Sequence, residues 1–139
     1  MTDAKQDLIR YRLQRAHEML EDGELLLRAG RLTSATNRIY YAMFYATNAL
    51  LATKNLSSSR HSGIIALLHD HFVRPGVFPR ELAKQLSFAF EMRNDSDYED
   101  FVTPEQSELT EMLGNARSFV RAAAELVEGR LPQDPPPPA

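Results

Sequence analysis

Apolar residues recur at helical spacing along most of the chain. Between about Thr2 and Ala29 they are separated by three or four residues, or by multiples of these steps, and charged residues fill most other positions: Ile9, Leu13, Ala16, Leu20 and Leu27. This spacing places apolar side chains on one face of an α-helix. We therefore predict an amphipathic helix that ends at Gly30, because glycine readily adopts the left-handed conformation found just after helices.

The next segment, from about Arg31 to Lys54, is apolar on several faces. One stripe steps by three and four residues through Leu32, Ala35, Ile39, Ala42, Ala46, Ala49 and Thr53, and other faces carry Tyr40, Met43, Phe44, Leu50 and Leu51. A helix that is apolar on several sides is buried on several sides. We expect this segment to be the central helix of the fold.

Two shorter helices follow. Asn55–Ser59 is typical of a loop whose serines can cap a helix, and that helix contains Ile64, Ile65, Leu67, Leu68 and Phe72. Pro75 and Gly76 end it. A fourth helix is predicted from near Pro79, with Leu82, Leu86, Ala89 and Phe90 on its apolar side.

The polar stretch Met92–Asp100 interrupts the helical pattern, and we predict that it separates the fourth helix from a fifth. Thr103 suits the N-cap of that last helix, and Pro104 suits its first turn. Apolar residues then step by four and three through Leu109, Leu113, Ala116, Val120, Ala123 and Val127, and Gly129 is the expected end.

The predicted fold class is all-α, an up-down bundle of four or five helices. No segment shows the alternation of an amphipathic strand, and the length of 139 residues suits one core. We assign residues 1–131 to a single helical domain. Residues 132–139 form a proline-rich tail that we expect to be disordered.

The amino-acid composition excludes several classes of functional site. The chain has no cysteine, which excludes disulfides, thiol nucleophiles and cysteine-based zinc sites. His69 and His71 are two residues apart, so on a helix they point about 200° apart and do not converge on a metal. We expect no metal and no cofactor. Without an apolar leader or a membrane-length apolar run, a soluble, cytoplasmic protein is expected.

The charges are unevenly distributed although the net charge is only −3. Residues 38–84 contain six Lys or Arg against two acids, whereas residues 91–111 contain eight acids and Arg93 as the single base. If the bases of residues 38–84 share one face, RNA could bind there. The alternative is a mixed, solvated surface.

Two further polar groups stand out. Arg38, Tyr41 and Tyr45 occupy positions i, i+3 and i+7, and so lie on one helix face. His61, in the stretch Ser58–Gly63, falls near a helix N-terminus, where free backbone N–H groups favour anions. Both groups are candidate contacts for a nucleic acid or a nucleotide.

Three stretches together resemble the HEPN family (higher eukaryotes and prokaryotes nucleotide-binding domain), and above all its small stand-alone prokaryotic branch. In that branch an Ala…Arg-x-Tyr-Tyr-Ala-x-Phe helix, a Ser…His…Gly turn and an Arg-x-x-x-Asp-Tyr motif follow one another. Here they are Ala35–Phe44, Ser58–Gly63 and Arg93–Tyr98. The match spans about residues 8–127.

The resemblance implies a helical bundle that forms a two-fold dimer, with two copies of the motif facing each other. Many members are metal-independent endoribonucleases with an Arg-x(4–6)-His motif, and many are toxins encoded beside a minimal nucleotidyltransferase that acts as antitoxin. By this resemblance Arg93 is the motif arginine and Asn94 the polar residue beside it. Tyr98 stands where the nuclease branch has histidine.

This replacement bears on catalysis. Histidine ordinarily titrates near 6.5 and tyrosine near 10, and general acid–base catalysis contributes roughly 10²–10⁴-fold. Tyr98, with Asp97, would therefore be a weak substitute for the missing histidine. Arg93 can still grip a phosphate with two hydrogen bonds, and Tyr98 can stack on a base. The motif favours binding over cleavage.

The sequence thus predicts an RNA- or nucleotide-binding protein, and a weak or degenerate endoribonuclease if it is an enzyme, acting as the toxin-like partner of a nucleotidyltransferase. The candidate catalytic residues are Arg93, Asp97 and Tyr98, and the candidate binding residues are Asn94, Arg38, Tyr41, Tyr45 and His61. By the resemblance, Tyr98 could also accept a nucleotidyl group from the partner. The alternative is a non-catalytic dimeric module that docks a nucleotidyltransferase.

Overall fold

The computed structural model describes residues 1–98 and 102–132, and within them the secondary structure is entirely helical. The helices are α1 (Asp3–Arg28), α2 (Leu32–Ala52), α3 (His61–Leu68), α4 (Arg80–Tyr98) and α5 (Gln106–Arg130). A short π-helical segment, η1 (His69–Val73), continues α3. The predicted all-α fold is confirmed.

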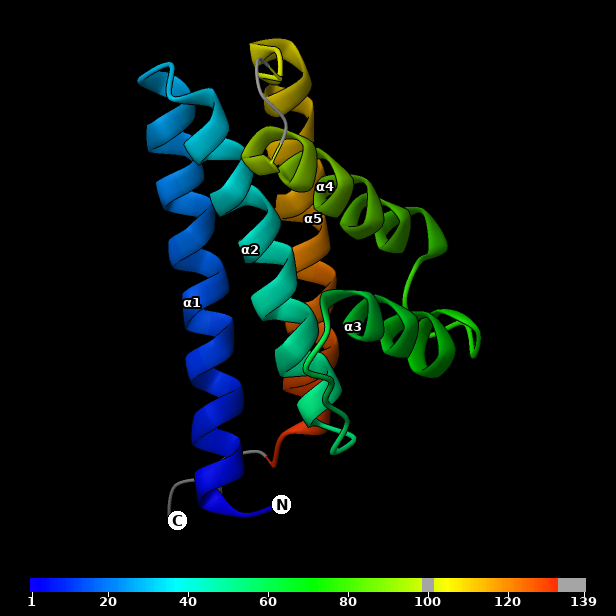
Figure 1. The fold of residues 1–139 in the computed structure, drawn as a ribbon. Coiled ribbons are helices and arrows are strands. Elements are labelled where there is room, and N and C mark those ends of the chain that lie inside the picture. The colour runs from blue at the N-terminus through cyan, green and yellow to red at the C-terminus, as the bar shows by residue number, and fades with distance from the viewer. Residues whose placement is uncertain (99–101, 133–139) are drawn as a thin grey trace.

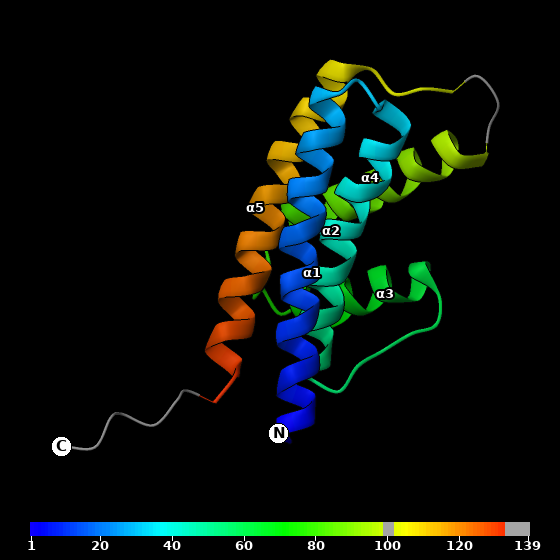
Figure 2. The same cartoon turned by 90° about the vertical axis from the view of Figure 1, so that its left-hand side faces the viewer.

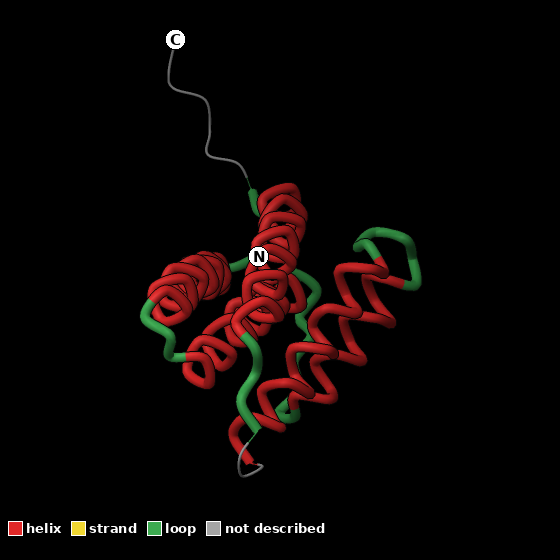
Figure 3. The backbone as a smooth tube through the Cα atoms, turned by 90° about the horizontal axis from the view of Figure 1, so that it is seen from above, coloured by secondary structure: helices red, strands yellow, loops and turns green. Residues whose placement is uncertain are grey.

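Helices α1, α2 and α5 run alongside one another and form the long bundle (Figure 1). The shorter α3 and α4 extend to one side, across the direction of the bundle, as the views in Figure 2 and Figure 3 also show. Each of the other four α-helices contacts α2. The bundle prediction therefore holds, and α2 is the central helix.

The burial pattern follows the apolar spacing of the sequence. On α2 twelve residues are buried: Ala35, Thr36, Ile39, Tyr40, Ala42, Met43, Ala46, Thr47, Ala49, Leu50, Leu51 and Ala52. The predicted apolar positions of α5 are all buried, as are those of α1 except for the half-buried Leu20. The hydroxyls of the buried threonines Thr36 and Thr47 donate to carbonyl oxygens four residues earlier on α2.

The end of α1 agrees with the prediction. Gly30 has a φ of 74°, and the N–H of Arg31 donates to the carbonyl of Leu26 over 2.9 Å. This is the hydrogen bond expected where a left-handed glycine closes a helix. The turn reverses the chain, so that α2 packs back along α1.

The predicted break at Met92–Asp100 is wrong for its first seven residues, because α4 continues through Tyr98. Polar residues persist in a helix here since Arg93 and Asp97, four residues apart, pair with each other. Asp95 is exposed, and Glu99 and Asp100 lie outside the described residues.

Other helix ends also differ from the prediction. The N-cap of α5 is Glu105, not Thr103, because the Glu105 and Glu108 side chains form a reciprocal capping box. Helix α5 passes Gly129 and ends at Arg130. The N-cap of α3 is Arg60, and Ser58 instead accepts a hydrogen bond from the Arg60 N–H.

Within the described residues, no helix is long and apolar enough to cross a membrane. Residues 133–139, which hold nearly all of the predicted disordered tail, lie outside the described part of the chain.

The close approach of α1 and α2 is testable at Gly23. A Cβ atom there would lie 3.0 Å from Ile39 Cγ1, whereas a Cβ at Gly114 of α5 would meet nothing within 4 Å. We expect Gly23→Leu to lower the free energy of unfolding by roughly 1–3 kcal/mol through overpacking. Gly114→Ala should raise it by about 0.5–1 kcal/mol through helix propensity. Urea unfolding of both variants measures this, and a neutral Gly23→Leu would contradict the close contact.

Candidate functional site

The candidate site is built around a buried tyrosine of α2. Tyr40 has 0% exposure, so its hydroxyl needs a hydrogen-bond partner. That partner is His61, the first residue of α3, whose Nδ1 lies 2.5 Å from the hydroxyl oxygen. This hydrogen bond connects α2 and α3, and the spacing of residues along the sequence does not predict that contact.

Aromatic rings enclose His61. Its ring stacks on Phe44 with the centroids 4.6 Å apart, and lies 5.7 Å from both Tyr40 and Phe90. Tyr41 meets it edge-on at 6.1 Å. These contacts fix the plane of the imidazole while leaving His61 half-buried rather than sealed.

The loop before α3 holds His61 in this position. The Ser58 side chain lies directly against Gly63, where a Cβ atom would collide with it. Ser58 Oγ also accepts the hydrogen bond of the Arg60 N–H. The serine, histidine and glycine of the Ser58–Gly63 motif therefore form one local unit that starts α3 with the histidine facing α2.

Arg93 of α4 lies against the same tyrosines. Its guanidinium carbon is 5.6 Å from the Tyr40 ring centroid and 5.3 Å from that of Tyr41, within the range of cation–π contact. Asp97 Oδ2 is 3.2 Å from Arg93 Nε, at ion-pair distance. The alignment is not that of a hydrogen bond, because the buried Nε has no hydrogen-bond partner within the described residues.

The terminal nitrogens of Arg93 make no hydrogen bond within the described part of the chain, and the side chain keeps 15% exposure. A guanidinium held by aromatic rings with its outer N–H groups free can bind a phosphate through two hydrogen bonds.

Burial and a neighbouring charge determine the protonation states of His61 and Tyr40. Burial lowers the pKa of His61, and the positive charge of Arg93 lowers it further, so the imidazole is neutral at neutral pH. Burial raises the pKa of Tyr40, which keeps the phenol protonated. The hydrogen bond between Tyr40 and Nδ1 of His61 is compatible with either neutral tautomer of the imidazole, and in the tautomer whose Nδ1–H donates to the Tyr40 oxygen, Nε2 is free to accept a proton.

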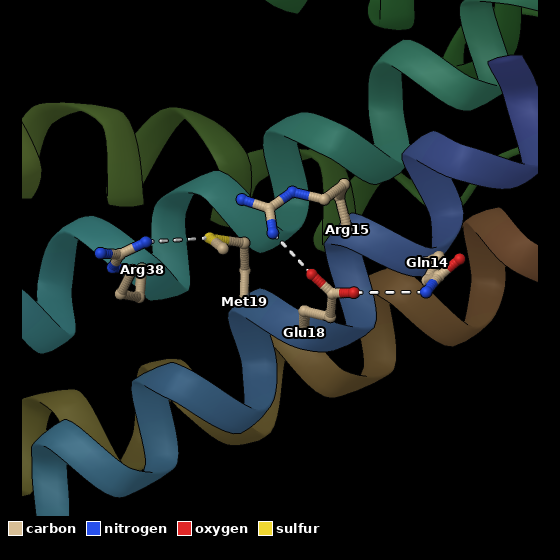
Figure 4. Close-up of polar contacts among 5 residues, drawn as sticks. All are labelled: Gln14, Arg15, Glu18, Met19 and Arg38. Carbon is tan, nitrogen blue, oxygen red and sulfur yellow. Dashed lines mark hydrogen bonds and ion pairs between the residues drawn. The ribbon is translucent and has the colours of Figure 1, made fainter.

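The remaining residues of the α2 face extend the site toward α1. Tyr41 and Tyr45 are neighbours, with centroids 6.4 Å apart, and the guanidinium carbon of Arg15 lies 5.5 Å from the Tyr45 ring. Arg38 is exposed and its Nη1 lies 3.7 Å from Met19 Sδ (Figure 4). We call Arg15, Tyr45, Tyr41, Arg38 and Arg93 the arginine–tyrosine strip.

A hollow of about 280 Å³ lies at the end of this strip. It is lined by Leu26, Thr33, Ser34, Asn37, Arg38 and Asp97. Arg38 and Asp97, from α2 and α4, therefore share one concave surface.

The structure separates Tyr98 from this group. Tyr98 is the last residue of α4 and is 76% exposed, so its ring does not pack in the aromatic cluster. Asn94 is half-buried beside Arg93, and its side chain makes no hydrogen bond within the described residues. The functional roles expected for Tyr98 and Asn94 stay predictions.

Sequence reasoning missed four residues of the site. Tyr40, Phe44 and Phe90 had been interpreted only as apolar helix residues, and Arg15 as part of a charged helix surface. No local spacing indicates the Tyr40–His61 hydrogen bond. The contact of Arg15 with Tyr45 depends on how α1 packs along α2.

Comparison with known proteins agrees with this architecture. Residues 9–127 match the HEPN domain, so the chain belongs to the HEPN family. A UPF0332 protein of Thermotoga maritima is 42% identical over 124 residues, covering 89% of this chain and 94% of that protein. Two proteins of Methanocaldococcus jannaschii, both named "Putative toxin", are 29% and 30% identical; they cover 78% and 76% of this chain, and 74% and 78% of their own lengths.

The lowered pKa of His61 predicts how stability depends on pH. As the pH falls below about 6.5, the unfolded chain binds a proton at residue 61 before the folded chain does, which lowers the free energy of unfolding. The free energy of unfolding stops falling once the pH is below the pKa that His61 has in the folded protein. His61→Gln, whose amide can still pair with Tyr40, should therefore lose less stability between pH 7 and pH 5 than wild type.

Chemical unfolding at a series of pH values measures this difference. His17→Gln, at an exposed position of α1, is the matched control and should follow wild type. Equal losses of stability in wild type and His61→Gln would contradict a half-buried imidazole that is neutral in the folded protein.

Proposed function

We propose that this HEPN protein is toxin-like and binds RNA at the arginine–tyrosine strip, with Arg93 as the main phosphate contact. The carrying observation is the placement of the Arg93 guanidinium against Tyr40 and Tyr41, with no hydrogen bond from its terminal nitrogens within the described residues. The relatives named as toxins support the toxin-like role.

The composition of the strip supports a single-stranded ligand. It combines three arginines, which attract phosphates, with two half-buried tyrosines on which bases can stack. Glu18 and Asp97 pair with two of the arginines, Arg15 and Arg93. A phosphate must displace these carboxylates from Arg15 and Arg93. Each phosphate that an arginine neutralises releases condensed counterions, so binding should weaken as the salt concentration rises.

Cleavage, if it accompanies binding, has a better-placed base than Tyr98. His61 is held neutral beside Arg93, and its Nε2 can take the proton of a ribose 2′-hydroxyl in the tautomer described above. The 2′-oxygen would then attack the phosphorus while the P–O5′ bond breaks and the leaving 5′-oxygen takes a proton from solvent water, and Arg93 would stabilise the phosphorane charge. The reaction would proceed without a metal.

The alternative function, a non-catalytic dimeric module that docks a nucleotidyltransferase, draws its support from Tyr98. A tyrosine that is 76% exposed at a helix end is accessible to a partner protein. Under this alternative the wild-type protein binds no RNA, so the following experiment also separates the two functions.

Arg93→Met removes the charge but keeps an unbranched side chain against the tyrosine rings. We expect it to weaken binding of a fluorescent 12-nucleotide RNA by roughly tenfold, and to lower the slope of log affinity against log salt by roughly 0.7, the value for one phosphate contact on a single strand. Fluorescence anisotropy measures both. Arg121→Ala on α5 is the control and should behave as wild type. Identical binding by wild type and Arg93→Met would refute the proposal.

Rates of RNA cleavage in the presence of EDTA, compared among variants, identify the residue that acts as general base. We expect slow cleavage by wild type that leaves a 2′,3′-cyclic phosphate, and a loss of about 10²-fold or more in His61→Gln because general base catalysis is removed. Tyr98→Phe and His17→Gln should retain the wild-type rate. Loss of cleavage in Tyr98→Phe, with His61→Gln unaffected, would instead assign the base to Tyr98.

A further inference from the structure

A second surface lies between α4 and α5, on the side of α4 that does not carry Arg93. It consists of two neighbouring hollows of about 300 Å³ and about 290 Å³. Phe88 and Glu108 line both hollows, so they mark the place where the two meet. We call this surface the α4–α5 groove.

The groove combines an apolar floor with an exposed aromatic ring. Met92, Met112 and Pro104 line it and are half-buried or buried, while Phe88 is 54% exposed. Methionines adapt to the shape of a partner, and an exposed aromatic ring beside a hollow is typical of a binding surface. No packing requirement of the described chain explains why Phe88 faces solvent.

The rim of the groove is acidic. Glu91, Asp95, Glu108 and Glu111 line the two hollows, and Lys84 is the single base among their lining residues. A partner that supplies basic groups would complement this surface.

From these observations we infer that the α4–α5 groove docks a basic, apolar-anchored segment of a partner protein, with an apolar side chain against Phe88 and lysines or arginines against the acidic rim. Helical and extended segments both present such a pattern. The segment would contact the last turns of α4 from the side opposite Asp97 and Arg93.

Other occupants fit the charges less well. RNA phosphates would be repelled by four carboxylates. In a two-fold pairing of this surface with a second copy, acids would face acids across the axis. The chain's own tail, residues 133–139, contains an aspartate and no base. A polypeptide with both apolar and basic side chains complements the apolar floor and the acidic rim of the groove.

A designed peptide tests this inference with the full-length protein. The probe is a fluorescein-labelled 16-residue peptide with leucines and lysines at helical spacing, and the matched peptide has glutamate in place of lysine. We expect fluorescence anisotropy to show binding of the Lys–Leu peptide alone. Phe88→Ala should weaken that binding by roughly tenfold or more, as loss of an aromatic anchor does.

Charge reversal supplies the matched control. Glu91→Lys with Glu111→Lys should weaken peptide binding, whereas Glu125→Lys with Glu128→Lys, the same charge change elsewhere on the surface, should not. Thermal melts verify that each variant is folded. The inference fails if the two double variants bind alike, or if Phe88→Ala binds as wild type does.

Two further measurements exclude the other occupants. If Phe88→Ala lowers the mass of the free protein in sedimentation, the groove belongs to a second copy and the inference is wrong. If Arg93→Met still binds the labelled 12-nucleotide RNA and adding Phe88→Ala abolishes that binding, the groove binds RNA and the inference is also wrong. Neither result depends on whether the arginine–tyrosine strip binds RNA.

Discussion

A helix with apolar side chains on nearly every side can be buried only when other helices cover all of its faces, and α2 imposes this constraint on the whole chain. Helices α1 and α5 cover two faces along the length of the bundle. The remaining face is covered by α3 and α4, which lie across it. Covering this last face buries Tyr40, whose hydroxyl cannot then reach water and must find a protein partner.

The candidate site follows from that requirement. His61 supplies the partner for the Tyr40 hydroxyl, and Arg93 lies over the same ring, so the packing of three helices places a neutral imidazole near a guanidinium. The outer side of α4 has no such partner, because Phe88 and the acids around it face solvent beside α5. The two proposals therefore assign RNA binding to one side of α4 and protein docking to the other.

Periodicity predicted the elements because apolar spacing alone determines which face of each helix is buried. The end of α4 was misjudged because polar residues were interpreted as a break, although Arg93 and Asp97 stand at the helical spacing i, i+4. At α5, the pair Glu105 and Glu108 formed the cap in preference to Thr103. The resemblance identified Arg93 and the Ser58–Gly63 turn. The resemblance did not predict the hydrogen bond between His61 and Tyr40, because residues 21 positions apart on two helices come into contact only through tertiary packing.

The central claim, that His61 and Arg93 belong to one ligand-binding site, is tested most directly by NMR of the four histidine rings during titration with the 12-nucleotide RNA. The account predicts that the resonances of His61 shift, that those of His17, His69 and His71 do not, and that the His61 shift disappears in Arg93→Met. An unchanged His61, or a shift that persists without the Arg93 charge, would contradict it.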